Sequence, residues 1–245
     1  GISKAGTSIT AGHLIYGILQ NSPVNNNLFY YNTSYIGGTV SSGSSGSYCF
    51  YSAVSAVRDY RNNNFVNSRS GNGAHYAIGL SGTTGLTCDH NNLYATGTNG
   101  FTGSLAAVNY ATLAQWQSAS GTDAMSMSGD PIFTNADGNS FLVNLGINTG
   151  SICNNEAISI TVSDDYNNTA RDISSPVGTP DIGAFEIPRG TAAGTWIGVI
   201  DTDWNKAGNW DDNTIPNSST NVYIVRGHKT LTGITDMPVI SSATA

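Results

Sequence analysis

The sequence predicts an all-β fold made of stacked parallel coils, and three observations support this prediction. Only 10% of the residues are charged, against about 25% in an average soluble domain. The chain takes its polarity from 29 glycines and from abundant Ser, Thr and Asn, while Thr, Val, Ile and Tyr supply strand-forming residues. This mixture suits short strands joined by many tight turns. Finally, an Asn-rich turn that enters an apolar residue recurs along the chain.

The recurrence has a period in the high twenties. Residues 24–29, 61–66 and 89–94 share the Asn-rich pattern, and the second and third copies lie 28 residues apart. Between these two copies the alignment pairs Tyr48 with Tyr76, Phe50 with Ile78, and Tyr60 with Cys88. The first copy precedes the second by 37 residues, and we assign the nine extra residues to the Gly/Ser run Gly37–Gly46 as a protruding loop.

A repeat of this length predicts a solenoid in which each unit forms one coil. Adjacent coils pair as parallel strands about 4.8 Å apart, so equivalent residues stack directly over one another. Asn at a bend bonds to its own backbone and to the Asn of the next coil. We therefore predict two structural ladders, and a sugar-binding row of amides is the alternative. The ladders are Asn26, Asn63 and Asn91, and Asn27, Asn64 and Asn92.

Residues 109–119 form the best helical stretch of the chain. Leu113 and Trp116 stand three residues apart on one face, and Gly121 follows as a C-terminal stop. On a solenoid, one short amphipathic helix of this kind covers the open end of the core.

A series of motifs follows this helix. In order they are Leu113-Ala114-Gln115-Trp116-Gln117, Gly121-Thr122-Asp123, Gly129-Asp130-Pro131-Ile132-Phe133, Phe141-Leu142-Val143, Ile147-Asn148-Thr149-Gly150, Asp164, Arg171 and Asp181-Ile182-Gly183-Ala184-Phe185-Glu186. Over residues 20–187 the sequence resembles the C-terminal end of secreted, pectin-lyase-like proteins that are common in Bacteroidota. The resemblance implies a right-handed parallel β-helix. It also implies a multi-domain surface protein like the adhesins of type IX secretion and gliding motility. The sequence departs from the family at 143–146, where relatives have a Ser-Pro pair.

A second β-rich module begins after Pro188. Trp196, Trp204 and Trp210 lie within 15 residues, and Asn221-Val222-Tyr223-Ile224 follows. Large aromatic side chains at such density fill the core of a small β unit, or form an exposed platform for sugars. The predicted organisation is residues 1–189 as the last coils and cap of a β-helix, 190–194 as a linker, and 195–245 as the start of the second module.

Charge and hydropathy exclude two classes of partner. The net charge of −7, with only nine Lys and Arg, argues against nucleic acid, which requires clustered basic residues. No apolar run approaches the roughly 20 residues of a transmembrane helix, and no signal peptide is visible. Because the chain begins at Gly1 without Met, we expect a processed product or part of a longer protein.

The predicted coils are poor in catalytic groups. Between residues 20 and 100 the acids are Asp59 and Asp89, and with Arg58 and Arg61 they are the candidates for a lyase site. Because Arg61 lies 28 residues before Asp89, we predict instead a surface ion pair between neighbouring coils. A Ser-His-Asp hydrolase lacks the G-x-S-x-G motif. No catalytic residue is therefore assigned.

No metal site is assigned either. Residues 164–168, Asp164-Asp165-Tyr166-Asn167-Asn168, carry oxygen ligands suited to Ca²⁺ without the spacing of a defined calcium loop, so a hydrogen-bonded turn is preferred. The four His have no metal-ligand spacing. Cys49, Cys88 and Cys153 form no C-x-x-C pair and are expected as small buried hydrophobes, with one disulfide and an odd thiol as the alternative.

These observations predict a non-catalytic segment of a large secreted cell-surface adhesin or structural rod. The expected partners are other modules of the same long chain and, more weakly, glycans or surfaces. No cofactor is expected apart from the Ca²⁺ alternative. The competing hypothesis is a polysaccharide lyase or glycoside hydrolase of the pectin-lyase-like fold, with its active site largely upstream.

Overall fold

The computed structural model describes residues 2–5, 8–9, 13–22, 26–136, 143–171, 179–187, 195–196, 200–210, 213–217 and 222–224. The chain divides into two compact units, Gly1–Ile187 and Pro188–Ala245. The linker predicted at 190–194 lies outside the described residues.

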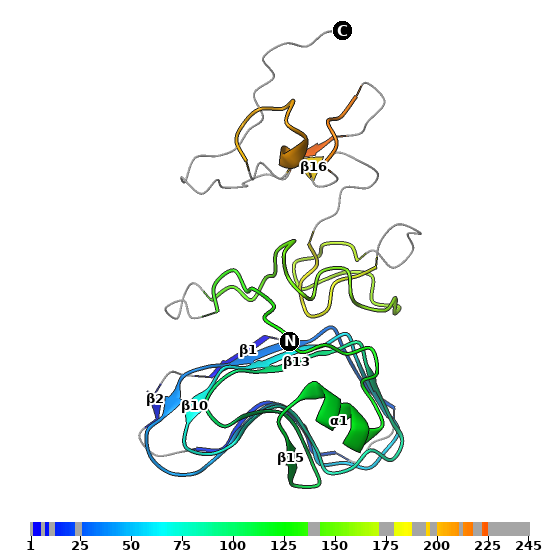
Figure 1. Cartoon of the computed structure of the whole chain (residues 1–245). Coiled ribbons are helices and arrows are strands. Elements are labelled where there is room, and N and C mark those ends of the chain that lie inside the picture. The colour runs from blue at the N-terminus through cyan, green and yellow to red at the C-terminus, as the bar shows by residue number, and fades with distance from the viewer. Residues whose placement is uncertain are drawn as a thin grey trace. The chain divides into compact units, whose positions relative to one another are not determined.

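The first unit opens with a β-solenoid of about three turns, seen nearly along its axis in Figure 1. Each complete turn contributes four short strands. The first turn holds β1 (Ile2–Ala5), β2 (Ser8–Ile9), β3 (Ile15–Gln20) and β4 (Asn27–Tyr30). The second holds β5 (Thr33–Ile36), β6 (Thr39–Val40), β7 (Ser47–Ser52) and β8 (Arg58–Arg61). The third holds β9 (Asn64–Asn67), β10 (Ser70–Gly71), β11 (His75–Leu80) and β12 (Leu86–Asp89). The chain continues through β13 (Asn92–Ala95), β14 (Gly100–Leu105) and β15 (Val108–Tyr110).

Equivalent strands of successive turns form four sheets along the stack. Sheet A is β1-β5-β9-β13, sheet B is β2-β6-β10, sheet C is β3-β7-β11-β14-β15, and sheet D is β4-β8-β12. All of these pairings are parallel except β14 with β15. The all-β prediction with parallel coils is therefore confirmed.

The register between the second and third turns is the one expected. Tyr48 pairs with Tyr76, Phe50 with Ile78, and Tyr60 with Cys88, all at a spacing of 28 residues. The register predicted for the first asparagine run, residues 25–27, was wrong, because Thr33 and not Asn27 pairs with Asn64. The Gly/Ser run is also not a nine-residue protruding loop, since β6 lies within it and pairs with β10. Only the stretch between β6 and β7 is longer than its equivalent in the next turn.

Apolar side chains from all turns fill the interior. Phe50, Phe65, Ile78 and Leu93 are fully buried in one cluster, and Trp116 of helix α1 (Leu113–Ser120) belongs to the same cluster. The helix was predicted, and it falls within the outline of the coils in Figure 1. It begins with a capping box formed by Thr112 and Gln115 and ends at Gly121, whose φ of 67° is left-handed.

The three cysteines follow the buried prediction. Cys49, Cys88 and Cys153 are all buried and free. Burial raises the pKa of the Cys88 thiol well above its usual value and that of Cys153 to about 12. The thiols are therefore protonated and unreactive at neutral pH.

The second unit, described by itself, is built on aromatic packing. Strands β16 (Thr195–Trp196) and β17 (Tyr223–Ile224) pair in parallel beside a short 3₁₀ helix η1 (Ala207–Asn209). Trp196 and Trp210 are both 1% exposed, and the Trp204 ring lies 4.5 Å from that of Trp210. This burial favours the core role of the rings over an exposed sugar platform.

Candidate functional site

The outward surface of sheet C carries an aromatic row that crosses the four strands β3, β7, β11 and β14. Parallel pairing aligns its members, because Tyr16, Tyr48, Tyr76 and Phe101 occupy equivalent strand positions. Their rings are stacked, with centroid separations of 5.5 Å, 4.5 Å and 5.6 Å along the row. Tyr48 and Tyr76 have a stacked ring on each side, so the middle of the row exposes mainly ring edges and hydroxyl groups. Burial and the adjacent phenols raise the pKa of Tyr48, which keeps the row neutral.

A second outward row lies three positions further along each strand. Leu19, Tyr51, Gly79 and Ser104 are aligned there by the same pairing. Gly79 lies inside strand β11 at a position where a side chain would collide with its neighbours. A Cβ there would lie 2.6 Å from Tyr48 and 2.7 Å from Tyr51. The Tyr48 and Tyr51 rings therefore both lie against the position of the missing side chain, and Tyr51 remains partly exposed. Leu19 beside it is 49% exposed.

Sheet C carries no ionised side chain at neutral pH. Strands β3, β7, β11, β14 and β15 contain no Asp, Glu, Lys or Arg, and His75 is their one histidine. It is fully buried, with Nδ1 2.9 Å from the Ser47 hydroxyl. Burial, with a smaller contribution from the nearby Arg69 cation, lowers its pKa to about 4. The outward face is thus uncharged, although the whole chain is acidic.

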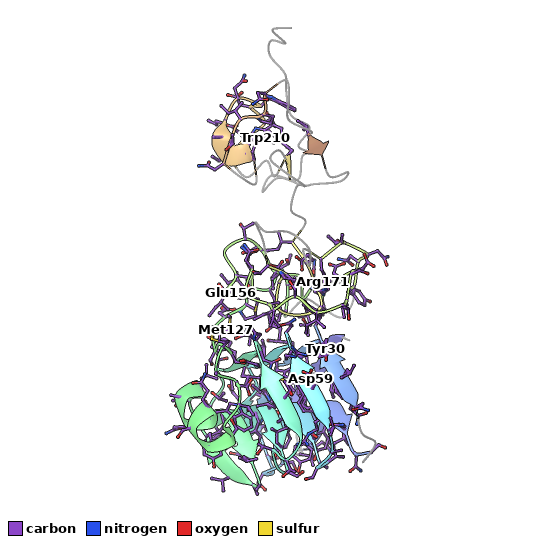
Figure 2. The ribbon with its side chains drawn as sticks, turned by 90° about the vertical axis from the view of Figure 1, so that its right-hand side faces the viewer. Tyr30, Asp59, Met127, Glu156, Arg171 and Trp210 are labelled. Carbon is purple, nitrogen blue, oxygen red and sulfur yellow. The ribbon has the colours of Figure 1, made fainter. Side chains whose placement is uncertain are left out.

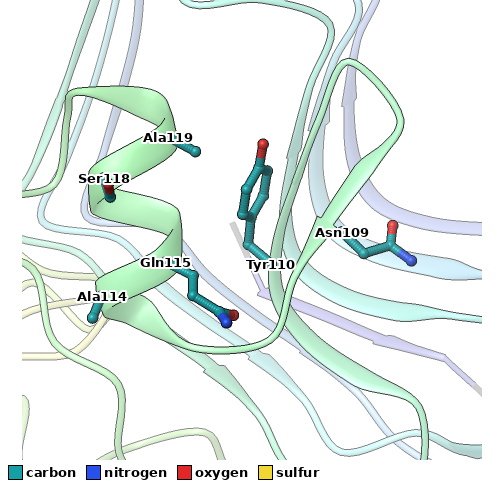
Figure 3. A pocket seen from close by; sticks show the side chains of 6 residues that line it. All are labelled: Asn109, Tyr110, Ala114, Gln115, Ser118 and Ala119. Atoms are coloured by element: carbon teal, nitrogen blue, oxygen red, sulfur yellow. The ribbon is translucent and has the colours of Figure 1, made fainter.

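A pocket of about 560 Å³ adjoins the aromatic row, between β15 and α1. Figure 3 shows the Tyr110 ring standing between hairpin and helix, with Gln115 beside it. The remaining lining residues are Asn109, Ala114, Ser118 and Ala119. Asn109 links the pocket to the row, because its Oδ1 accepts a hydrogen bond of 2.8 Å from the Tyr76 hydroxyl.

Amide ladders run along the corner between sheets D and A. Asn63 Nδ2 donates to Asn91 Oδ1 at 3.0 Å, and Asn92 Nδ2 donates to Asn64 Oδ1 at 3.0 Å. The first-turn assignments need correction. Asn32, not Asn26, donates its Nδ2 to Asn63 Oδ1, also at 3.0 Å.

Asn26 and Asn27 lie one corner earlier than predicted. Asn27 belongs to β4 and pairs with Arg58. Opposite Asn64, where Asn27 was predicted, the structure has Thr33. The reason lies in the backbone. At the ladder corner, Tyr31, Asn62 and His90 adopt left-handed φ values of 54°, 61° and 53°. The first turn makes that bend without a run of asparagines.

The predicted ion pair between Arg61 and Asp89 does not form. The two residues do pair in register on neighbouring turns. Arg61 instead binds Asp59 on its own strand through Nε at 2.7 Å and Nη2 at 2.5 Å, and Tyr30 donates to the same carboxylate at 2.7 Å. Residues two apart on a strand share a face, and the Asp89 carboxylate is occupied by backbone N–H groups, so Arg61 bonds to Asp59. Figure 2 shows Tyr30 and Asp59 next to each other on the solenoid.

The other candidate lyase residues are also engaged in hydrogen bonds. The Asp89 carboxylate accepts from the backbone N–H groups of His90 at 2.9 Å and Met125 at 2.7 Å. Arg58 is 1% exposed and donates to the carbonyls of Ala56 and Thr84. Asp59 is therefore bonded to other side chains of the same sheet, and Asp89 and Arg58 are bonded to the backbone of strands and turns.

The residues behind the family resemblance form a polar cluster beside the coils. Arg171 and Glu186 are bonded at 3.1 Å with side chains 1% exposed, and the guanidinium lies 3.9 Å from the Tyr31 ring centroid. Asp181 accepts from the backbone N–H groups of Asn155 and Ile187, and Figure 2 places Arg171 within this loop-rich segment. The closing motif is therefore structural.

The segment joins the solenoid at the ladder corner. Asn62 donates to the Ile158 carbonyl at 2.7 Å and accepts from the Ile158 N–H at 3.0 Å. Gly183 N–H bonds to the Asn62 carbonyl at 2.8 Å. At 143–146, where the family resemblance breaks, Asn144 Oδ1 accepts from Gly146 N–H and closes a turn without the Ser-Pro pair.

The candidate calcium segment is a hydrogen-bonded turn. Asp165 Oδ1 accepts from the N–H groups of Asn167 and Thr169, both at 2.7 Å, and Oδ2 accepts from Glu186 N–H. Within the described residues no group of three His, Cys, Asp or Glu side chains is placed to hold a metal ion. No helix in the described ranges is long and apolar enough to span a membrane.

Fold and surface define the first unit as a β-solenoid with one neutral aromatic face and one charged face. Comparison with protein-family models, curated protein sequences and solved structures finds no match to this chain. The sequence reasoning paired Tyr48 with Tyr76 but missed the outward surface they build. A signal was present: Gly79 stands inside a strand, where glycine marks a close approach by another group.

Proposed function

We propose that this chain is a non-catalytic β-solenoid segment of a large secreted cell-surface adhesin or structural rod. The observation that carries the proposal is that the acidic side chains on the coils are engaged in hydrogen bonds within the protein. Asp59 and Asp89 are bonded to Arg61 and to backbone N–H groups. A general acid or base must instead reach the scissile bond of a substrate.

The stacking favours a rigid, elongated element. Each turn is joined to the next by parallel backbone pairing, by amide ladders and by stacked rings. Such an array contacts mainly its nearest neighbours, and extended solenoids of this type present long surfaces for binding. The motif series at residues 113–186 supports the surface-protein assignment through its resemblance to secreted β-helix proteins, and the other modules of such a protein are the proposed covalent partners.

The proposal is tested by incubating the whole chain with pectins, alginates and glycosaminoglycans, with and without Ca²⁺. We expect no unsaturated products and no new reducing ends. Activity that vanished in Asp59→Asn or Asp89→Asn variants would establish the lyase or hydrolase alternative instead. Export is tested separately by protease treatment of intact producing cells, which should degrade the protein if it is displayed on the surface.

A further inference from the structure

We propose that the outward face of sheet C binds an uncharged glycan chain, with the Tyr51 ring as its platform. This inference rests on the adhesive function proposed above and names its ligand class. It combines three observations: a partly exposed ring lying over a glycine, an adjoining apolar strip, and the absence of ionised groups across the sheet.

The platform is built from the second outward row. Because Gly79 has no side chain, the Tyr51 ring packs against this position of the neighbouring strand together with Tyr48. Tyr48 contacts it edge-on at 5.0 Å and 64°, and Tyr16 lies at 5.5 Å and 48° on the same side. Leu19, 49% exposed, extends the apolar surface beyond the ring. An exposed apolar patch of this kind, bordered by polar groups, is typical of a binding surface.

The border of the platform supplies hydrogen-bonding groups. Tyr16 and Tyr48 carry hydroxyl groups along one side, and the exposed amide of Asn109 lies at the end of the row, next to the pocket between β15 and α1. A sugar ring has an apolar C–H face and a rim of hydroxyls. It can therefore stack on Tyr51 while its rim bonds to phenols and amides, which both donate and accept.

Charge selects the ligand class. The face has no Lys, Arg or ionised His with which to bind uronate or sulfate groups, and the chain has a net charge of −7, which repels polyanions. The coil spacing of about 4.8 Å is close to the length of one sugar unit. A neutral chain aligned with the solenoid axis would thus pass over Leu19, Tyr51 and Gly79 on three successive strands, with one sugar unit stacked on the Tyr51 ring.

The test is calorimetric titration of the whole chain with cellohexaose, xylohexaose, mannohexaose and hexagalacturonate. We expect at least one neutral hexasaccharide to bind and hexagalacturonate not to bind. Tyr51→Ala should weaken binding at least tenfold, while Tyr51→Phe, which keeps the ring, should retain it. Leu19→Glu adds a charge at an exposed position without disturbing the core, and it should weaken binding several-fold.

Tyr30→Ala is the matched control, because Tyr30 is a partly exposed tyrosine on sheet D, and it should leave binding unchanged. Circular dichroism of each variant verifies the fold. The inference is overturned if no neutral hexasaccharide binds at millimolar concentration, if hexagalacturonate binds better, or if both Tyr51→Ala and Leu19→Glu bind normally. These failures would leave the non-catalytic proposal intact, since that proposal is tested by product formation.

Discussion

Sheets C and D belong to the same turns of the same solenoid, yet their outward faces have opposite chemistry. Sheet C presents stacked aromatic rings and no ionised group, whereas sheet D presents Tyr30, Asp59, Arg61 and Asp89. Parallel pairing in register explains how both patterns persist from turn to turn, because each strand position repeats along its own row. The charge and aromatic content of each outward face are therefore determined by the residues of its own stacked row.

The two faces also differ in the interactions that stabilise them. A stacked aromatic pair contributes about 0.5–1.5 kcal/mol beyond the area it buries, whereas a partly exposed ion pair contributes about 0–1 kcal/mol. The charged side of the coil is stabilised mainly at its corner, where the amide ladder begins after β4, β8 and β12. Four substitutions or conditions separate these contributions, and they follow from the largest expected effect to the smallest.

Asn63→Leu should cause the greatest loss of stability, about 4 kcal/mol in the free energy of unfolding. The buried amide donates to Asn91 and to the Phe29 carbonyl and accepts from Asn32. Its loss leaves several buried polar groups without hydrogen-bond partners, at a cost of about 1–3 kcal/mol each. Urea denaturation measures the change. The exposed Asn72→Leu variant, a control on another corner, should change stability by no more than about 0.5 kcal/mol. Equal effects of the two would refute the ladder's importance.

Acid should destabilise sheet C through His75. Its pKa is about 4 in the folded protein against 6.5 for an unperturbed His, so the unfolded chain gains a proton first as the pH falls. Stability is therefore lost between pH 6.5 and 4 and changes no further from this group below pH 4. The full loss is up to about 3 kcal/mol at 1.36 kcal/mol per pKa unit. Unfolding curves of a His75→Gln variant should show a weaker pH dependence over this interval, and an unchanged slope would contradict the assignment.

Gly103→Ala should cost about 2 kcal/mol by overpacking the end of the core. A Cβ at this position would lie 2.3 Å from Cε3 of Trp116, which is itself fully buried. Thermal unfolding gives the comparison with Gly82→Ala, whose nearest contact would be 3.6 Å away and which should be nearly neutral. If both variants melted alike, the helix would not be packed against β14 as described.

Arg61→Ala should have the smallest effect, below about 1 kcal/mol. The guanidinium is partly exposed, and Asp59 keeps the hydrogen bond from Tyr30 when Arg61 is removed. Differential scanning calorimetry should therefore show a nearly unchanged melting temperature. A loss comparable with that of Asn63→Leu would mean that sheet D depends on its surface charges after all.

The predictable part of the fold was the part where the repeat runs without interruption. Asn63 and Asn91 are 28 residues apart with no insertion between them, so the register could be read directly. The preceding turn misled the alignment because residues 25–27 form a run of three asparagines like that at 62–64. The ladder uses the single Asn32, whose spacing to Asn63 is 31 residues. Backbone geometry at the corner, not asparagine density, determines which residue stacks.

The candidate site was harder to predict than the fold. Register alone aligned Tyr48 with Tyr76, but the direction of a side chain depends on strand phase. In β7 both Cys49 and Phe50 are buried, which breaks simple alternation. The position of Tyr51 across Gly79 also depends on a neighbouring turn. The prediction for Arg61 and Asp89 was wrong for a related reason: strand pairing gave the correct neighbours, but the Asp89 carboxylate accepts from backbone N–H groups and Arg61 bonds to Asp59.

The reversed strand at the end of sheet C has a consequence for self-association. An exposed edge of a parallel stack offers unpaired N–H and C=O groups to any other copy of the same sheet. Here β15 runs antiparallel along β14, Met127 bonds to the backbone of Asn91 and Leu93 beside β13, and Asp123 N–H bonds to the Cys88 carbonyl in β12. Each of these edges is thus occupied by the chain itself. Continuation of the parallel stack by a further molecule at β12, β13 and β14 would therefore first require the hairpin and the 123–127 segment to detach.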